Sequence, residues 1–252
     1  MKLLRFAPLA MFATLLFGLP AEGMQVSPLT SNPVRIGTIQ HNPPYVIENP
    51  SSGIDMDTIR AAFSAVGRDV EFVHAPLTRI SSLLRTRRID GITTLVGMGS
   101  QCTLSQVFGY WHDGVVVRRD LDKSVSTIAD LASLRVGMFP SASAVFAEKL
   151  GPHAASFASE TVINSTPSVL RLLQYGRIDA YIGDIWGLEA LAADEDTAKG
   201  YPFRIAMTFE PTPRYVCFLE GEVTEQFNAG LEELNVLGQL ARIVNRYRPQ
   251  GK

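Results

Sequence analysis

The chain has 252 residues, of which 46% are hydrophobic and 19% charged, an ordinary globular balance that can bury a core. Its formal net charge is −2, and lysine and arginine form no run with interleaved aromatic residues. Neither nucleic acid nor an anionic membrane surface is therefore indicated as a partner. The length suits one large domain or two small ones.

The N-terminus has the pattern of a secretory signal peptide. A positively charged start is followed by an apolar run over residues 6–19, and Ala21 and Gly23 are the small residues of a cleavage site before Met24. We expect residues 1–23 to be removed and the mature protein to be exported. A membrane anchor is the alternative, but the run is short for a bilayer core of about 30 Å.

Residues that could bind metal or perform catalysis are sparse. The four histidines are scattered without metal-ligand spacing, so no metal site is predicted. Export permits a disulfide between Cys102 and Cys217, and two buried thiols are the open alternative. A reactive thiol at Cys102 beside His41 has nothing visible to lower its pKa. Nucleophile-elbow, phosphate-loop and dinucleotide motifs are missing, so we predict no cofactor and no catalytic residue.

The first part of the mature chain alternates between strand and helix patterns. A buried strand is followed by a loop with two prolines that carries Tyr45, and Gly53 then opens a helix with Asp55 in its first turn. The predicted strands span 34–39, 69–74 and 89–95, and the predicted helices run from 53 to 67 and from 77 to 87. This alternation predicts a parallel sheet with helices on its faces.

After an irregular segment over residues 97–113, the pattern restarts. Residues 114–119 and 214–219 form two extended connectors in this prediction. Between them we predict strands at 134–139, 161–163, after 177 and at 203–208, and helices at 144–150, from 165 or 166, and at 186–194. The last segment, 224–247, is predicted to be helical with a break near Gly238.

Two internal echoes indicate two lobes built alike. The stretch 83–92 matches 172–181 at an offset of 89 residues, and Val34–Gly37 matches Leu134–Gly137 at an offset of 100. We therefore predict an α/β protein of two lobes. The first lobe takes residues 24–117, the second takes 118–208, and residues 209–252 return to the first lobe.

Ligands of open parallel sheets bind beyond the carboxyl ends of the strands. That rule gathers a ring, several hydroxyl groups and one carboxylate, which suits a small polar solute. The residues it selects are Tyr45, Thr94, the loop with Gly97, Ser100 and Cys102, then Ser141, Ser143 and Asp184. Asp90 and Asp179 lie at strand beginnings, so we interpret both as structural.

Each selected residue also has a structural interpretation. Tyr45 could fill a surface gap, and Ser141 and Ser143 could simply cap a helix. Asp184 could cap the helix predicted to start near Trp186.

Several motifs, taken in order, resemble one known family. They are Gly53–Asp57, Arg88–Ile92, Phe108, Leu134–Gly137, Gly176–Ala180 with Asp184, and Leu237–Tyr247. Together they are similar to the family 3 bacterial solute-binding proteins, the periplasmic receptors of polar amino-acid ABC importers. The resemblance implies the type II periplasmic binding protein fold, in which each lobe is a mainly parallel sheet flanked by helices and two hinge crossings allow closure. It also implies a monomeric periplasmic receptor whose partners are a small solute and an inner-membrane ABC permease.

Some positions depart from the family pattern. The family's carboxylate-gripping arginine aligns with Cys102, and its clamp aromatic aligns with Leu77, which joins the predicted ligand-binding set. Ser141 and Ser143 replace part of a Gly-Thr-Thr run, whereas Asp184 matches the residue that takes the ligand's α-amino group. Losing a bidentate arginine argues against ordinary amino-acid binding, unless Arg79 or Arg214 substitutes.

The leading hypothesis is a solute-binding protein that captures a small polar, amine-bearing or amino-acid-like solute for an ABC importer. The alternatives are a periplasmic receptor that feeds a membrane sensor and a small-molecule dehydratase on the same fold. An enzyme would need a general acid or base besides Asp184, and none is evident. We therefore predict that the protein is not an enzyme.

Overall fold

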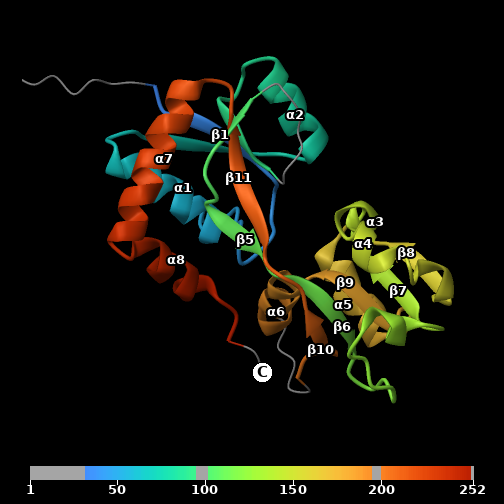
Figure 1. Ribbon diagram of the computed structural model, residues 1–252. Coiled ribbons are helices and arrows are strands. Elements are labelled where there is room, and N and C mark those ends of the chain that lie inside the picture. The colour runs from blue at the N-terminus through green and yellow to red at the C-terminus, as the bar shows by residue number, and fades with distance from the viewer. Residues whose placement is uncertain (1–31, 95–101, 195–199, 251–252) are drawn as a thin grey trace, which may run out of the picture. The chain divides into compact units, whose positions relative to one another are not determined.

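The structure is a computed structural model that describes residues 32–94, 102–194 and 200–250 (Figure 1). The predicted signal peptide lies outside these ranges. Among the described residues, none of the helices combines the length and the apolar character needed to cross a membrane.

The first sheet has the strand order β2-β1-β3-β11-β4, with β5 added along β11. Its strands are β1 (Val34–Thr38), β2 (Val70–His74), β3 (Gly91–Thr94), β4 (Thr103–Leu104), β5 (Gly109–Trp111) and β11 (Thr212–Phe218). Strand β1 pairs in parallel with β2 and β3, as the alternating pattern predicts. Strand β11 pairs antiparallel with β3, β4 and β5.

The second sheet has the order β10-β6-β9-β7-β8. Its strands are β6 (Asp113–Arg118), β7 (Arg135–Met138), β8 (Ser159–Val162), β9 (Ala180–Asp184) and β10 (Phe203–Thr208). Strand β7 pairs in parallel with β8 and β9, while β6 lies antiparallel between β9 and β10.

Helices cover both faces of the first sheet. They are α1 (Ile54–Ala65), α2 (Leu77–Arg85), α7 (Gly221–Val236) and α8 (Gln239–Tyr247). Figure 1 shows α7 running alongside α1, and the backbone of Ala62 is so close to Gly230 that a Cβ there would collide with it. Helix α8 also reaches α1, because the Tyr247 hydroxyl donates to Asp57 Oδ2 at 2.6 Å. Apolar residues of α2 pack with those of β3 in a separate cluster on the other face.

Within the described ranges, the second sheet carries four helices and two apolar clusters. Its helices are α3 (Ala142–Val145), α4 (Ala147–Leu150), α5 (Thr166–Gln174) and α6 (Ile185–Asp194), with 3-10 turns at Ile128–Leu131 and Ala154–Ser156. One cluster gathers α3 and α4 with β7, and the other gathers α5 and α6 with β9.

Three local predictions need correction. The two extended connectors are full antiparallel strands, β6 and β11, because their valine-rich and aromatic residues are buried within the sheets. The helix predicted at 144–150 is interrupted at Phe146, whose φ and ψ of −111° and 30° are not helical. The segment interpreted as irregular contains β4 and β5.

Other predictions are confirmed, including the two internal echoes. The final helical segment breaks at Gly238, where φ is +64°. In each sheet the echoed glycine gives room for isoleucine side chains: a Cβ on Gly37 would lie 2.6 Å from Ile89 Cδ1, and one on Gly137 would lie 2.9 Å from Ile178 Cδ1. The residue boundaries of the two lobes stay a prediction.

Candidate functional site

Tyr45 is held by a loop folded against the start of α1. The backbone N–H groups of Ile54 and Asp55 donate to the carbonyl oxygens of Pro44 and Tyr45 at 2.9 and 3.0 Å. Gly53 makes this approach possible, since its φ is +112° and a Cβ would collide with the Tyr45 carbonyl. The Tyr45 ring is 1% exposed, so it is part of the interior rather than a surface filler.

The Tyr45 hydroxyl donates to Asp184 Oδ1 at 2.9 Å. Its ring is stacked with Trp186 at 6.5 Å and meets Trp111 edge-on at 4.2 Å between centroids. Tyr45, which follows β1 of the first sheet, thus contacts Asp184, which ends β9 of the second sheet. The rule that ligands bind beyond strand ends had selected both residues.

Asp184 also caps helix α6, as its structural interpretation anticipated. Its Oδ2 accepts the backbone N–H of Gly187 at 3.1 Å. A Cβ on Gly187 would lie only 2.5 Å from that oxygen, so glycine leaves the carboxylate room. Capping and lining a pocket are compatible roles here, because each carboxylate oxygen keeps a second lone pair.

A pocket of about 190 Å³ lies beside Asp184. Aromatic rings, short polar side chains and two carboxylates line it: Asn42, Trp111, Asp113, Phe139, Ser141, Val145, Thr166, Tyr181, Asp184 and Thr212. This combination of apolar walls with a few polar groups is typical of a small-molecule site.

Asp113 is a pocket residue that sequence reasoning missed. It begins β6, is 7% exposed, and accepts the Thr212 hydroxyl at 3.3 Å. It lies directly opposite Asp184 in the pairing of β6 with β9. The available signal was an acidic residue two positions before the buried run Val115–Val117, which the connector interpretation of that segment obscured.

Burial raises the pKa of both acidic groups of the pocket, and for Asp184 the neighbouring Asp113 charge adds to it. Burial is the largest cause that raises the pKa of Asp184 to about 8, and the nearby Asp113 charge is the second. The hydrogen bonds of Asp184 and the charge of Arg214 lower this pKa, but by less. Burial raises the pKa of Asp113 to about 6. The pKa values of the Tyr45 and Tyr181 hydroxyls are also raised, by burial first and then by the Asp184 charge. Two carboxylates that resist ionisation together favour a cation between them.

Arg214 is not available to grip a ligand carboxylate. It is 3% exposed and forms a bidentate ion pair with Asp55, which is completely buried in α1. Its guanidinium lies 4.0 Å from the centroid of the Trp111 ring. Arg79, the other suggested substitute, is exposed on α2 and is not among the residues that line the pocket.

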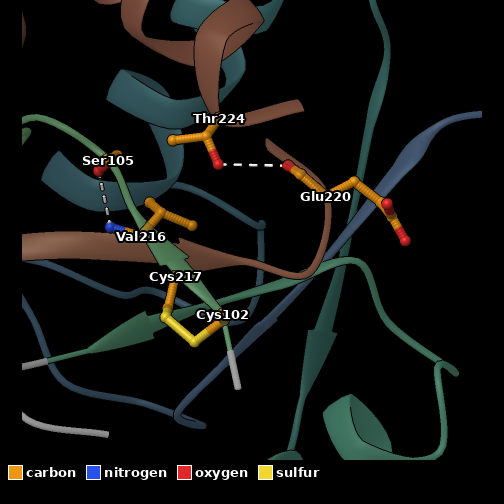
Figure 2. Close-up of a disulfide and its surroundings, with 6 residues drawn as sticks. All are labelled: Cys102, Ser105, Val216, Cys217, Glu220 and Thr224. Atoms are coloured by element: carbon orange, nitrogen blue, oxygen red, sulfur yellow. Dashed lines mark hydrogen bonds between the residues drawn. A yellow bond between two sulfur atoms is a disulfide. The ribbon is translucent and has the colours of Figure 1, made fainter. Parts of the chain in front are cut away.

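Cys102 is joined to Cys217 by a disulfide, with a Cα–Cα distance of 5.4 Å (Figure 2). This resolves the two alternatives left by the sequence and leaves no thiol at either position. The bond ties the segment before β4 to the C-terminal end of β11, beside an apolar cluster. Contact between Cys102 and a ligand stays a prediction.

The remaining predicted ligand contacts have different outcomes. Ser141 lines the pocket and precedes α3, which has a single turn and no side-chain cap. Ser143 is exposed, and its hydroxyl donates to Met138 Sδ at 3.4 Å. Leu77 begins α2 and Thr94 ends β3. Gly97 and Ser100 lie outside the described residues.

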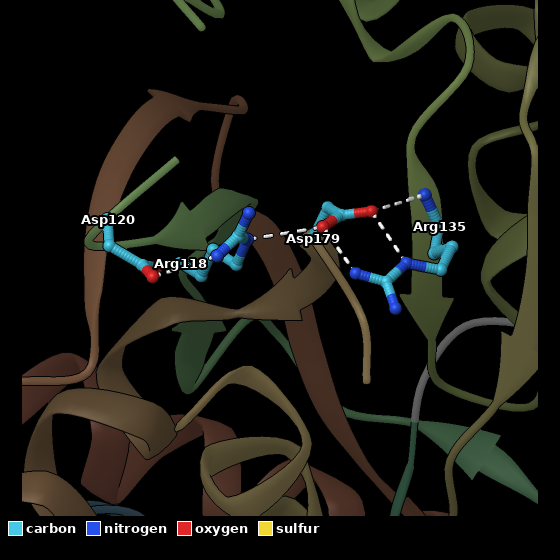
Figure 3. A network of polar contacts seen from close by, with 4 residues as sticks. All are labelled: Arg118, Asp120, Arg135 and Asp179. Carbon is cyan, nitrogen blue, oxygen red and sulfur yellow. Dashed lines mark hydrogen bonds and ion pairs between the residues drawn. The ribbon is translucent and has the colours of Figure 1, made fainter. Parts of the chain in front are cut away.

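The structural roles given to Asp90 and Asp179 are confirmed. Asp90 accepts the backbone N–H of Arg35 at 2.7 Å. Asp179 accepts the backbone N–H of Arg135 at 3.0 Å and forms ion pairs with Arg135 and Arg118 (Figure 3). In the part of the chain that the structure describes, histidine, cysteine and acidic residues form no group of three or more that could hold a metal ion.

Comparisons with known proteins identify the fold class first. The arrangement of two α/β sheets is that of the type II periplasmic binding proteins. An ancestral arginine-binding protein bound to arginine matches with a TM-score of 0.69 and 24% identity over 86% of this chain and 98% of its own. A Salmonella typhimurium periplasmic binding protein with high arginine specificity matches with a TM-score of 0.66 and 16% identity, over 86% of this chain and all of its own.

A histidine kinase sensor domain with similarity to periplasmic binding proteins also matches. Its TM-score is 0.69 at 17% identity, over 86% of this chain and 96% of its own. No curated protein sequence matches the chain. The profile of the bacterial extracellular solute-binding proteins, family 3, matches residues 34–250. The chain belongs to that family, and the predicted resemblance is confirmed.

Proposed function

We propose that this protein is a periplasmic receptor that binds a small amine-bearing, amino-acid-like cation in the pocket beside Asp184 and delivers it to an inner-membrane ABC importer. The observation that carries the proposal is the charge of the pocket. Asp113 and Asp184 line it, and none of the described residues that line it is cationic. Such a site attracts a cation and opposes an anion.

The family and the fold support binding rather than catalysis. The matched family consists of solute-binding proteins, and arginine-binding proteins are among the similar structures. The N-terminal pattern of the sequence supports export, with cleavage near Met24. Residues 24–117 with 209–252 and residues 118–208 would form the two lobes that close on the solute.

A second candidate function is sensing, and one observation favours it specifically. The same fold matches a histidine kinase sensor domain about as well as it matches arginine-binding proteins. In that role the same cationic ligand would be detected by a membrane sensor instead of being imported. Capture of a purified permease by the liganded protein supports import, and capture of a sensor protein supports signalling.

A thermal-shift screen of the mature protein tests the binding function. Small amines, amino acids and organic acids are the probes, because a ligand that binds only the folded state raises the melting temperature. We expect cationic compounds to raise it and monocarboxylates to leave it unchanged. In Asp184→Asn the affinity for a cationic ligand should fall by about 1.5–3 kcal/mol, the range for hydrogen bonds to charged groups. A monocarboxylate that binds better than every amine would contradict the proposal.

A further inference from the structure

Asp113 and Asp184 occupy directly opposite positions in the antiparallel pairing of β6 with β9. Directly opposite residues point to the same face of a sheet, with their Cβ atoms about 5 Å apart. Both side chains also line the same pocket. The two carboxylates are therefore near neighbours in one partly enclosed space.

The two acids differ in how their oxygens are used. Asp184 accepts one hydrogen bond on each oxygen, from the Tyr45 hydroxyl and the Gly187 N–H. Asp113 is almost completely buried, yet among the described residues its carboxylate accepts only the Thr212 hydroxyl, at 3.3 Å. A buried carboxylate is costly unless it is paired with a charge or fully hydrogen-bonded. Asp113 thus keeps acceptor capacity for a further donor, on a carboxylate that lines the pocket.

The titratable and charged groups around the pair do not supply a charged donor to Asp113. Tyr45 follows β1 and is committed to Asp184, and Tyr181 on β9 is a neutral hydroxyl. Arg214 on β11 is held by Asp55, and its guanidinium lies over the Tyr45 and Trp111 rings, at 5.2 and 4.0 Å from their centroids, outside the pocket lining. Within the described part of the site, a ligand cation is the remaining candidate to pair with these two carboxylates.

We propose that Asp113 and Asp184 form a two-carboxylate cation site, and that its ligand is a small amine or guanidine whose cationic head bridges both acids and bears no carboxylate beside it. This inference rests on the proposed function and narrows it. A carboxylate next to the ligand's head would face two acids with no described cationic side chain in the lining. The aromatic walls, Trp111, Phe139 and Tyr181, suit the face of a guanidinium or an alkyl stem.

The volume of the pocket and the protonation of its two acids agree with a small cationic ligand. About 190 Å³ holds the equivalent of about six waters at about 30 Å³ each, which limits the ligand to a small molecule. Since the pKa of Asp184 is raised to about 8 and that of Asp113 to about 6, Asp184 is mostly protonated and Asp113 mostly ionised in the free protein at pH 7. A bound cation favours both ionised forms, so its binding releases protons to the solvent.

Isothermal titration calorimetry with matched probes tests the inference. Agmatine and arginine differ only in the carboxylate, and so do putrescine and ornithine. We expect the decarboxylated member of at least one pair to bind about tenfold tighter or more, a difference of about 1.4 kcal/mol. Repeating the titration at pH 7 in buffers of different ionisation enthalpy measures the protons released. We expect a release that disappears at pH 9, where both acids are already ionised.

Variants separate this inference from the proposed function. Asp113→Asn should weaken binding of the preferred amine about tenfold or more and reduce the proton release. Asp122→Asn, at an exposed position, should leave both unchanged.

Binding that is lost in Asp184→Asn but unaffected in Asp113→Asn would overturn the two-carboxylate site while the binding function stands. Arginine and ornithine binding tighter than their amines would also overturn it. If no cation binds the wild type, the proposed function itself fails. If Asp113→Asn does not fold, the comparison of each amine with its amino acid on the wild type remains the test of the site.

Discussion

The two sheets begin their echoed strands with the same backbone clamp. Asp90 before β3 and Asp179 before β9 each donate their N–H to the carbonyl oxygen of an arginine at 2.8 Å, Arg35 in one sheet and Arg135 in the other. Each aspartate carboxylate accepts the backbone N–H of the same arginine, at 2.7 Å for Asp90 and 3.0 Å for Asp179. The matching Arg-Ile-Asp triplets therefore encode a matching local structure.

The clamps differ in the ion pairs that surround them. Arg35 Nε lies 3.8 Å from Asp90, and both side chains are about 40% exposed. Asp179, only 10% exposed, receives two side-chain bonds from Arg135 at 2.7 and 2.9 Å and one from Arg118 at 3.2 Å. These contacts hold the pKa of Asp179 below its usual range, with the Arg135 hydrogen bond as the largest cause.

The neighbouring antiparallel strand explains the difference. Leu219, just after β11, donates its N–H to the Asp90 carbonyl oxygen at 2.9 Å, and Arg118 at the end of β6 donates to that of Asp179 at 3.0 Å. One backbone position thus carries an apolar residue in the first sheet and an arginine in the second. A short repeat can specify a clamp, whereas a residue distant in sequence decides how strongly charged groups reinforce it.

The largest effect on stability that we expect comes from removing a buried charge of the first sheet, in the Asp55–Arg214 ion pair. Asp55→Ala leaves the Arg214 guanidinium buried without a partner, so the free energy of unfolding should fall by about 3–5 kcal/mol. Asp57→Ala, two residues along the same helix and with more exposed partners, should cost about 1–2 kcal/mol. Urea unfolding measures both.

A double replacement serves as the control for that result. Asp55→Leu with Arg214→Met removes both charges, and most of the lost stability should return because no buried charge stays unpaired. Equal losses in Asp55→Ala and Asp57→Ala would show that the buried pair contributes nothing special to the first sheet.

The disulfide is a second feature of the first sheet without a counterpart among the described residues of the second. It closes a loop between positions 115 residues apart. Reduction of the wild type, or Cys102→Ala with Cys217→Ala, should lower the free energy of unfolding by about 2–4 kcal/mol. Melting curves with and without reductant measure the effect, and the double variant serves as the control that no longer responds to reductant. Identical curves for the wild type would contradict the expectation.

A pH series tests the acidic end of β9. A carboxyl group with a raised pKa binds more protons when the protein is folded than when it is unfolded. The stabilising contribution of Asp184 to the free energy of unfolding is therefore fully present below about pH 4 and is lost as the pH rises towards 8. One such group changes the unfolding free energy by at most about 1.4 kcal/mol per pH unit. We expect the ligand-free protein to be less stable at pH 8 than at pH 6, by no more than about 2.7 kcal/mol for Asp184.

Asp184→Asn should remove most of that slope, because the amide does not titrate. Asp179 does not interfere in this pH range, since its lowered pKa makes its contribution disappear only in acid, below about pH 4. A wild type whose stability rises from pH 6 to pH 8 would contradict the shift assigned to Asp184.

Much of this fold could be predicted from the sequence because local patterns carry it. Alternating apolar runs and glycine stops located β1, β10 and the break at Gly238, and the echoed triplets predicted the structural roles of Asp90 and Asp179. The strands β6 and β11 were harder, since an extended apolar run does not reveal which sheet it enters or in which direction.

The site was only partly predictable for a related reason. The strand-end rule selected Tyr45 and Asp184, which the structure brings within hydrogen-bonding distance. Asp113 was missed because its role depends on lying opposite Asp184 across two strands, and that register is a tertiary property. The Asp55–Arg214 pair spans 159 residues and was equally invisible in local patterns.

The smallest effect we predict isolates the one residue that distinguishes the two clamps. Arg118→Leu gives the second sheet the apolar residue found in the first. Asp179→Ala should then cost about 1 kcal/mol less in this background than in the wild type, a coupling typical of a partly exposed ion pair. A double-mutant cycle by urea unfolding measures it. Arg118 also contacts Asp120, but that carboxylate is 78% exposed, so Asp120→Ala should show no coupling above about 0.5 kcal/mol and serves as the matched control. If Asp179→Ala costs the same with and without Arg118, the backbone clamp and Arg135 alone account for the stronger ion pairing of the second sheet.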